Sequence, residues 1–340
     1  MIVVIVIYLS LLIAAIFLLA LSKSTSKTKL GAAKSVTVII PFKNEAKRIQ
    51  PLIASLNQSD FSDQIELIFV DDHSTDDTVN LILQSLDLPF RLLKLKETSG
   101  KKSAIAYGIQ NATHEPIHTI DADVSFASDY LSNISKLPLS DLTILPVKLS
   151  GSSLFQQLNA IEFQWLQTFT FSLAKLKNPT LCNGANLSFS KSAFIKSLKT
   201  RTDFAEPSGD DIYLLEAVKK SAGNIIAFND VRLEVQTPAP ASFSSLISQR
   251  KRWIQKVLNG SAVVLILLYL LYNAVPFLAL FKTDESLFWF LPLILKITVE
   301  FVLSNRLTIK QFLLTILHQV YYPIYGLTLL LSLPFKGKWK

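Results

Sequence analysis

The chain has 340 residues, of which 50% are hydrophobic, and it carries a net charge of +8. Its mean hydropathy is positive, and the apolar excess lies at the two ends, which excludes an evenly patterned soluble domain. Basic residues cluster beside the apolar segments, which favours contact with a membrane surface over binding of nucleic acid. The single cysteine, Cys182, excludes an intrachain disulfide.

The N-terminal residues 2–21 are apolar and uncharged. Twenty helical residues extend ~30 Å, the thickness of a bilayer core, so we predict a transmembrane helix over residues 1–22. A cleaved signal peptide is disfavoured because no basic residue precedes the run and no small-residue cleavage site follows it. The polar residues 23–35 are interpreted as a linker. Four lysines lie in or near it, and because basic flanks tend to stay in the cytosol, we expect the next domain to be cytosolic. These are Lys23, Lys27, Lys29 and Lys34.

From residue 36 the pattern changes to short apolar strands that alternate with amphipathic helices. This alternation predicts an α/β domain with a mostly parallel sheet, in which ligands bind beyond the carboxyl ends of the strands. Residues 151–255 read as more helical and mixed. The predicted strands are 36–40, ending at Pro41, then 65–70, 90–95 and 117–120, and the predicted helices are 45–58, 76–86 and 101–111.

Acidic residues follow two of the predicted strands. Asp121 and Asp123 are two residues apart in an extended segment, so their carboxylates point to the same side and could hold Mg²⁺ or Mn²⁺. The alternative is a solvated acidic turn. Asp71 and Asp72 could accept hydrogen bonds from a base or a ribose, whereas the following residues read equally well as a helix cap.

Two further polar segments precede predicted helices. Lys101, after Gly100, offers a cation for a diphosphate near a helix N-terminus, or is merely solvated. Asp210 and Asp211 precede an apolar helical stretch. Either the helix dipole favours these acids, or one of them is a general base that deprotonates an attacking hydroxyl.

A basic and aromatic segment lies just before an apolar stretch, at residues 249–253. It reads as a juxtamembrane basic helix with an aromatic anchor. Alternatively, its guanidinium groups contact a leaving diphosphate, and both readings are compatible. The residues concerned are Gln249, Arg250, Arg252 and Trp253.

Taken in order, these motifs resemble the inverting family 2 glycosyltransferases, a group that includes cellulose, chitin and hyaluronan synthases and ceramide glucosyltransferase. The resemblance covers about residues 36–255 and the flanking membrane spans. It implies a GT-A nucleotide-sugar-binding fold, an inverting single displacement and a UDP- or GDP-linked donor. The residues that it assigns to nucleotide-sugar binding are Pro41, Asn44, Glu45, Asp71, Asp72, Lys101 and Asp121.

The resemblance also implies roles in catalysis. Asp211, paired with Asp210, is expected to be the base, and Asp123 with Asp121 is expected to hold Mg²⁺ or Mn²⁺. Gln249, Arg250, Arg252 and Trp253 are expected at the diphosphate and the acceptor. The segment from Asn183 to Asn186 lies near the acceptor or forms a tight turn.

Three positions depart from the family pattern. Asp210 stands where glutamate is usual, Ala106 where asparagine is usual, and His73 where glycine is frequent. None of them removes a residue with an assigned chemical role.

Two other functions compete with this interpretation. A nucleotidyltransferase would need a glycine-rich loop after the first strand, and residues 41–46 contain no glycine. A non-catalytic membrane scaffold would be expected to lose the acidic and basic motif residues, which are present. The acceptor is expected to be a lipid, a lipid-linked sugar or another cell-envelope glycan. The few predicted membrane helices favour a single transfer over chain extension.

The C-terminal region, 256–335, is predicted to contain about three membrane helices, within 257–281, 287–303 and 311–334, followed by a basic tail at 336–340. Lys296 and Glu300 lie four residues apart inside the second stretch, where charges are costly unless they are paired or near the interface. We therefore weigh four full spans, which we favour, against a re-entrant or broken segment. The protein is expected to be integral to the cell membrane.

Overall fold

A computed structural model describes residues 2–24, 29–199, 210–258, 272–273, 276, 290–303 and 308–332. The chain divides into two compact units. The sheet unit comprises Ser22–Leu149 and Leu173–Pro238, and the helical unit comprises Met1–Leu21, Ser150–Ser172 and Ala239–Lys340. Part of the stretch predicted as one soluble domain, 36–255, thus groups with the helical unit.

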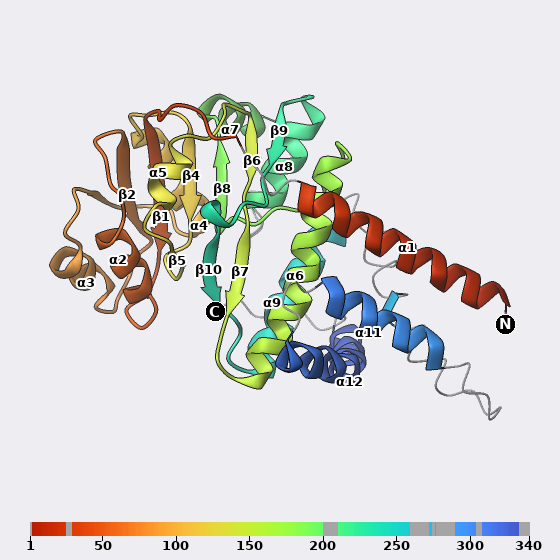
Figure 1. The fold of residues 1–340 in the computed structure, drawn as a ribbon. Helices are drawn as coiled ribbons and strands as arrows, with labels where there is room; N and C mark the ends of the chain where they lie inside the picture. The colour runs from red at the N-terminus through yellow and green to blue at the C-terminus, as the bar shows by residue number, and fades with distance from the viewer. Residues whose placement is uncertain are drawn as a thin grey trace. The chain divides into compact units, whose positions relative to one another are not determined.

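The sheet unit is built on a seven-stranded sheet with the order β3-β2-β1-β4-β8-β6-β9 (Figure 1). Its strands are β1 (Val36–Phe42), β2 (Ile65–Asp71), β3 (Arg91–Lys94), β4 (Ile117–Ile120), β6 (Leu142–Ile144), β8 (Asn186–Phe189) and β9 (Ile225–Ala227). Strand β8 is antiparallel to β4 and β6, whereas the other pairs are parallel. The prediction of an α/β fold with a mostly parallel sheet is confirmed.

A second, three-stranded sheet was not predicted. It has the order β5-β10-β7, with β5 (Ser125–Phe126), β10 (Val235–Pro238) and β7 (Val147–Ser150). Its strands come from distant parts of the chain, and β5 has only two residues, so the sequence pattern carries no signal for it.

Strand β1 runs past the proline at which it was expected to end. Pro41 lies opposite Val70 of β2, and pairing with β2 continues to Phe42. On the other side, β4 pairs only with residues 37–39 of β1. The missing N–H of Pro41 therefore falls where β4 no longer pairs, so the strand tolerates it.

Helices cover the large sheet. They are α2 (Gln50–Asn57), α3 (Thr78–Ser85), α4 (Lys101–Asn111), α5 (Tyr130–Ile134), α7 (Lys191–Leu198) and α8 (Asp210–Lys220), with a 3₁₀ turn at Val231–Leu233. Helix α4 lies close to the sheet because Gly108 has no side chain. A Cβ at that position would come within 2.7 Å of Ile39 on β1.

Helix α2 begins later than the predicted residue 45. The backbone N–H of Glu45 donates to Thr78 Oγ1 at 2.8 Å, and that of Ala46 donates to Asp76 Oδ2 at 3.1 Å. These bonds hold residues 45 and 46 in a loop. The helix then begins at Gln50, with Pro51 in its first turn, where the lack of an N–H costs nothing.

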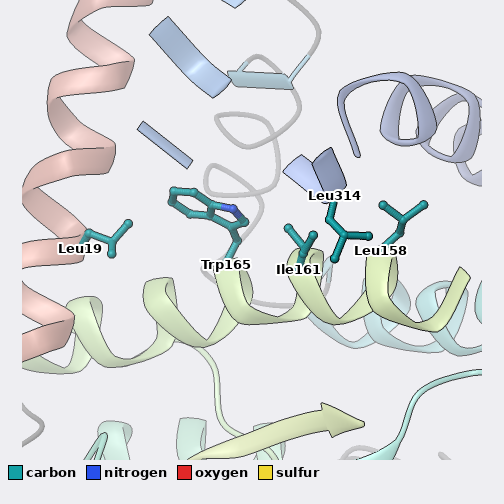
Figure 2. Packing of buried hydrophobic residues seen from close by; sticks show 5 residues of the cluster. All are labelled: Leu19, Leu158, Ile161, Trp165 and Leu314. Atoms are coloured by element: carbon teal, nitrogen blue, oxygen red, sulfur yellow. The ribbon is translucent and has the colours of Figure 1, made fainter. Parts of the chain in front are cut away.

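The helical unit contains α1 (Ile2–Ser24), α6 (Leu154–Lys175), α9 (Phe243–Leu258), α11 (Leu291–Leu303) and α12 (Ile309–Ser332). Figure 2 shows one of its buried clusters, in which side chains of α1, α6 and α12 meet. The cluster consists of Leu19, Leu158, Ile161, Trp165 and Leu314. Apolar contacts of this kind hold the three helices together.

Among the described residues, α12 is the one helix that is long and apolar enough to cross a membrane. The described apolar part of α1, Leu12–Ser22, is shorter. Helix α11 begins at Leu291, inside the predicted stretch 287–303. Most of the predicted stretch 257–281 and the whole basic tail 336–340 lie outside the described residues. The transmembrane assignments stay predictions.

Candidate active site

Two loops with unusual backbone geometry follow β1 and β2. Asn44 and His73 are both in the left-handed region, with φ of 54° and 60°. A hydrogen bond of 3.1 Å from Asn44 N to Ser74 Oγ and one of 2.8 Å from Thr75 N to Asn44 Oδ1 join the loops. Left-handed geometry is costly for residues with a side chain and is readily adopted by glycine.

The two aspartates at the end of β2 are buried and fix these loops. Asp71 accepts a hydrogen bond of 2.9 Å from Ser74 N. Asp72 accepts one of 2.9 Å from Gly100 N, and it lies 3.7 Å from Lys43 Nζ. Gly100 has a φ of 98°, which L residues rarely adopt. Asp72 therefore ties the start of α4 to the end of β2.

A group of opposite charges links the loop after β1 to Asp123. Arg48 lies 2.6 Å from Glu45 and 3.9 Å from Asp123. Burial raises the pKa of Glu45 to about 7 against the lowering effect of Arg48, and the nearby Asp123 and Asp121 add to the rise. Burial, followed by repulsion from Asp121, also raises the pKa of Asp123. Ionisation of both carboxyl groups is therefore unfavourable here, even with Arg48 close to them and Lys101 near Asp123.

Lys101 connects the metal motif to the acidic pair of α8. Its Nζ donates to Asp121 Oδ1 in a short hydrogen bond. Burial alone would lower the pKa of Lys101, but the carboxylates of Asp121, Asp210 and Asp211 outweigh burial and raise it. The first residue of α4, the end of β4 and the first turn of α8 therefore meet at one edge of the sheet.

Asp211 is held by backbone donors. Its Oδ2 accepts a hydrogen bond of 3.1 Å from Gly184 N, and its Oδ1 accepts one of 2.9 Å from Ile212 N. Gly184 lies in the segment for which the sequence left two readings open. Asn183 Oδ1 closes a turn there by accepting a hydrogen bond of 3.0 Å from Ala185 N. The segment therefore both forms a tight turn and lies next to Asp211.

Asn186 belongs to the core. Its Oδ1 accepts a hydrogen bond of 2.8 Å from the hydroxyl of Tyr130. Its Nδ2 donates at 2.8 Å to the backbone oxygens of Pro146 and Leu233. With both ends of the amide used inside the fold, this side chain is structural.

The acidic edge fits a divalent cation. Glu45 Oε2 is buried and has no hydrogen-bond partner, and Asp123 and Asp121 repel each other. Within the described parts of the chain, no three histidine, cysteine or acidic side chains are grouped as metal ligands. A cation there would need water or diphosphate oxygens as well, which is how Mg²⁺ is usually held in phosphate-transferring sites.

Gln249, Arg250, Arg252 and Trp253 lie on α9 in the helical unit, whereas the acidic edge belongs to the sheet unit. Ser208 and Gly209, which precede the acidic pair, lie outside the described residues.

Sequence reasoning missed Arg48 and Thr237. Arg48 could have been found, because its spacing of three residues from Glu45 is typical of a local ion pair. Thr237 Oγ1 donates to Asp123 Oδ1 at 3.4 Å. It reaches Asp123 only because β10 pairs with β5, and no local pattern predicts that pairing.

Residues 37–195 match the family model described as Glycosyl transferase family 2. The chain therefore contains a family 2 glycosyltransferase domain with a GT-A fold.

Curated relatives carry names that refer to N-acetylglucosamine. The chain is 28% identical over 202 residues to the poly(ribitol-phosphate) β-N-acetylglucosaminyltransferase TarP of Staphylococcus aureus, over 55% of this chain and 58% of that one. It is 26% identical over 254 residues to an N-acetylglucosaminyltransferase of Neorhizobium galegae, over 70% of this chain and 58% of that one. The chain thus spans less than two thirds of the length of these relatives.

Among solved structures, the mannosyltransferase PcManGT of Pyrobaculum calidifontis, in complex with GDP-Man and Mn²⁺, has a similar fold. The TM-score is 0.59 at 17% sequence identity, and the match covers 99% of each chain. At this identity the likeness concerns the fold alone.

Proposed function

We propose that this protein is a membrane-bound, inverting glycosyltransferase that uses a UDP- or GDP-linked sugar. We further propose that its GT-A domain occupies about residues 36–255 and lies in the cytosol. The flanking helices are proposed to lie in the cell membrane. Support for the activity comes from the family 2 domain and from the arrangement of charges at the carboxyl edge of the sheet.

The observation that carries the proposal is the position of Lys101. It donates to Asp121, and the acidic pair Asp210 and Asp211 raises its pKa. Residues far apart in the sequence therefore meet where open α/β sheets bind their ligands. A cation at the N-terminus of α4 beside carboxylates suits a diphosphate and its counter-charges.

In the proposed reaction, Asp211 takes the proton of the acceptor hydroxyl as that oxygen attacks the anomeric carbon. The N–H groups of Gly184 and Ile212 hold its carboxylate in one orientation. The carboxylate also lies in the first turn of α8, where the helix dipole favours negative charge. Asp210 lies beside it in the same turn.

The proposed cofactor is Mg²⁺ or Mn²⁺, which we assign to Asp123 and Asp121. When bound, it would neutralise charge that develops on the leaving diphosphate. The buried, unpartnered Oε2 of Glu45 and the repulsion between Asp123 and Asp121 support this assignment. Pro41, Asn44, Asp71 and Asp72 are proposed to shape the nucleoside site, because the loops after β1 and β2 are braced against each other there.

The helical unit supplies the remaining proposed roles. We assign Arg252 to the diphosphate and Gln249 and Trp253 to the acceptor. An acceptor that is a lipid or lipid-linked sugar agrees with the apolar outer face of α12, where exposed side chains recur at helical spacing. They include Ile316, Val320, Ile324, Leu327 and Leu331. A glycan acceptor remains the other class to test.

The test is release of nucleotide and transfer of labelled sugar by purified protein, screened over UDP- and GDP-sugars. Donors of N-acetylglucosamine come first because several of the curated relatives, these two included, are named for it. We expect Asp211→Asn to keep donor binding and to lower turnover about 10²- to 10⁴-fold, the usual contribution of a general base. The matched control is Asp87→Asn, on the surface loop after α3. Turnover near that of the wild type in Asp211→Asn would refute the assigned base.

A further inference from the structure

Arg250 forms a buried ion pair inside the helical unit. Its Nε and Nη2 lie 3.2 Å and 2.8 Å from Glu162 Oε2, and the two side chains are only 4% and 5% exposed. Glu162 comes from α6, so this pair joins α9 to α6. Breaking a pair at such depth leaves an uncompensated charge, which is strongly unfavourable.

The pair extends to α12. The hydroxyl of Tyr325 donates to Glu162 Oε1 at 3.1 Å, so both oxygens of this carboxylate have a partner. Tyr325 is itself buried, in a cluster with Leu246 of α9. Polar and apolar contacts therefore fasten α9 to α6 and α12 at the same point.

The same guanidinium contacts two neighbours on α9. Nη1 donates to Gln249 Oε1 at 2.6 Å, and the guanidinium carbon lies 4.2 Å from the centre of the Trp253 ring. The ring of Phe163, which follows Glu162 on α6, lies 5.7 Å from that of Trp253. Helix α6 thus contacts Trp253 through Phe163 and is linked to it a second time through Glu162 and Arg250.

We propose that Arg250 is a positioning residue, which uses the carboxylate of Glu162 as an anchor to set the orientation of Gln249 and Trp253. This inference rests on the proposed function, in which those two side chains meet the acceptor. It replaces the direct contact with the diphosphate that the sequence predicts for Arg250. All three of its side-chain nitrogens have protein partners, and Glu162 balances its charge.

Two substitutions separate orientation from folding. Arg250→Lys keeps a cation beside Glu162 but cannot also bond Gln249 and stack on Trp253, because an ammonium lacks the planar fork. Glu162→Gln keeps the shape and an acceptor for Tyr325 but removes the anchoring charge. The matched control is Lys148→Gln, which breaks a partly exposed ion pair with Glu234 at 3.6 Å.

Two readouts are measured on the full-length protein. In each variant, kcat is expected to fall about 10- to 100-fold, the usual effect of a misplaced positioning group. KM for the donor is expected to stay the same, because neither substitution removes a proposed donor contact of the sheet unit or Arg252. Without substrate, the fluorescence of Trp253, taken as the difference from Trp253→Phe, should change in wavelength and in quenching by acrylamide. Lys148→Gln should alter neither readout.

The outcomes are distinguishable. An unchanged Trp253 signal in both variants overturns the inference, whether or not the wild-type protein transfers sugar. A changed signal with normal kcat also overturns it, since orientation would then not matter for turnover. If the wild type is inactive with every donor while the Trp253 signal changes, the proposed function fails and the link from Glu162 to Trp253 stands. Melting temperatures identify any variant that fails to fold, and the other variant then decides.

Discussion

Several residues at the edge of the sheet have a backbone geometry or a buried polar atom that is unfavourable by itself. Asn44 and His73 adopt left-handed backbone geometry, and Glu45 keeps a buried oxygen without a partner. Each is an unfavourable choice by itself, of about 1–3 kcal/mol, and such residues gather at functional sites. Arg48 is the compensating charge, because it lies between the carboxylates of Glu45 and Asp123.

This geometry predicts how Arg48→Gln changes the response to metal. Loss of the guanidinium leaves the carboxylates to repel each other, so the protein in chelator should lose about 1 kcal/mol of stability. That corresponds to a fall of about 2–4 °C in melting temperature. Saturating Mn²⁺ should restore most of the loss, so that its stabilising shift is larger in the variant than in the wild type.

The control is Arg91→Gln, because Arg91 pairs with Glu66 on the sheet away from the metal motif. Its response to Mn²⁺ should equal that of the wild type. If Mn²⁺ shifts neither the wild type nor Arg48→Gln, the assigned metal site is wrong.

At the scale of elements, buried polar networks define how neighbours pair. His118 of β4, Tyr130 of α5 and Asn186 of β8 form a chain in which each hydrogen bond is 2.8 Å long. Burial lowers the pKa of His118 to about 3, so the ring is neutral in the folded protein. The network therefore selects one neutral tautomer.

His118 predicts a loss of stability in acid. In the unfolded chain His118 takes up a proton near pH 6.5, but in the folded chain only near pH 3. The contribution of the neutral ring to the free energy of unfolding is therefore complete above pH 6.5 and falls as the pH decreases. Between pH 6.5 and pH 5 the loss should be about 2 kcal/mol. Denaturant unfolding at pH 7 and pH 5 would measure it.

In His118→Gln the difference between the free energies of unfolding at pH 7 and pH 5 should shrink by about this amount, although the variant is less stable at both pH values. His114→Gln is the matched control, because that ring is not fully buried. An equal pH dependence in wild type and His118→Gln would show that other groups cause the loss.

A second network joins α11 to α12. Lys296 and Glu300 are each 2% exposed, with Nζ and Oε1 2.7 Å apart. Gln319 of α12 contacts both, donating to Glu300 Oε2 at 2.6 Å and accepting from Lys296. The charges that made this stretch doubtful as a membrane helix are thus paired, which is the condition under which such charges are tolerated.

At the scale of the molecule, the proposed catalytic residues are divided between two units. The sheet unit holds the acidic edge, and the helical unit holds α9 with Gln249, Arg252 and Trp253. Helix α12 turns buried polar side chains inward and exposed apolar ones outward, and this arrangement suits contact with acyl chains. The proposed membrane attachment and the proposed acceptor site therefore belong to the same unit.

Four full spans predict that the C-terminal tail lies outside the cytosol. A cysteine replacing Lys340, in a Cys182→Ser background, should react with an impermeant reagent on right-side-out membranes without permeabilisation. A cysteine replacing Lys220, on α8 of the proposed cytosolic domain, is the control and should react only after permeabilisation. Labelling at position 340 only after permeabilisation would exclude four spans and favour a re-entrant segment.

The sequence by itself determined the features that depend on local pattern. Apolar periodicity predicted β2, β4 and α4 nearly to the residue, because buried strands and helices impose their own repeat on the chain. The acidic motifs were also visible, since residues at strand ends and helix starts keep their order in the sequence. Their catalytic roles remain proposals that the experiments above test.

Only the tertiary structure decided the features that depend on distant pairing. The insertion of β8 between β4 and β6 brings Gly184 to Asp211, and the pairing of β5 with β10 brings Thr237 to Asp123. Arg250 is the clearest case, because its partner Glu162 lies 88 residues away. From the sequence alone, an arginine is interpreted as an unpaired cation. Its carboxylate partner is found only in the fold, because charge pairing acts through space and leaves no local sequence pattern.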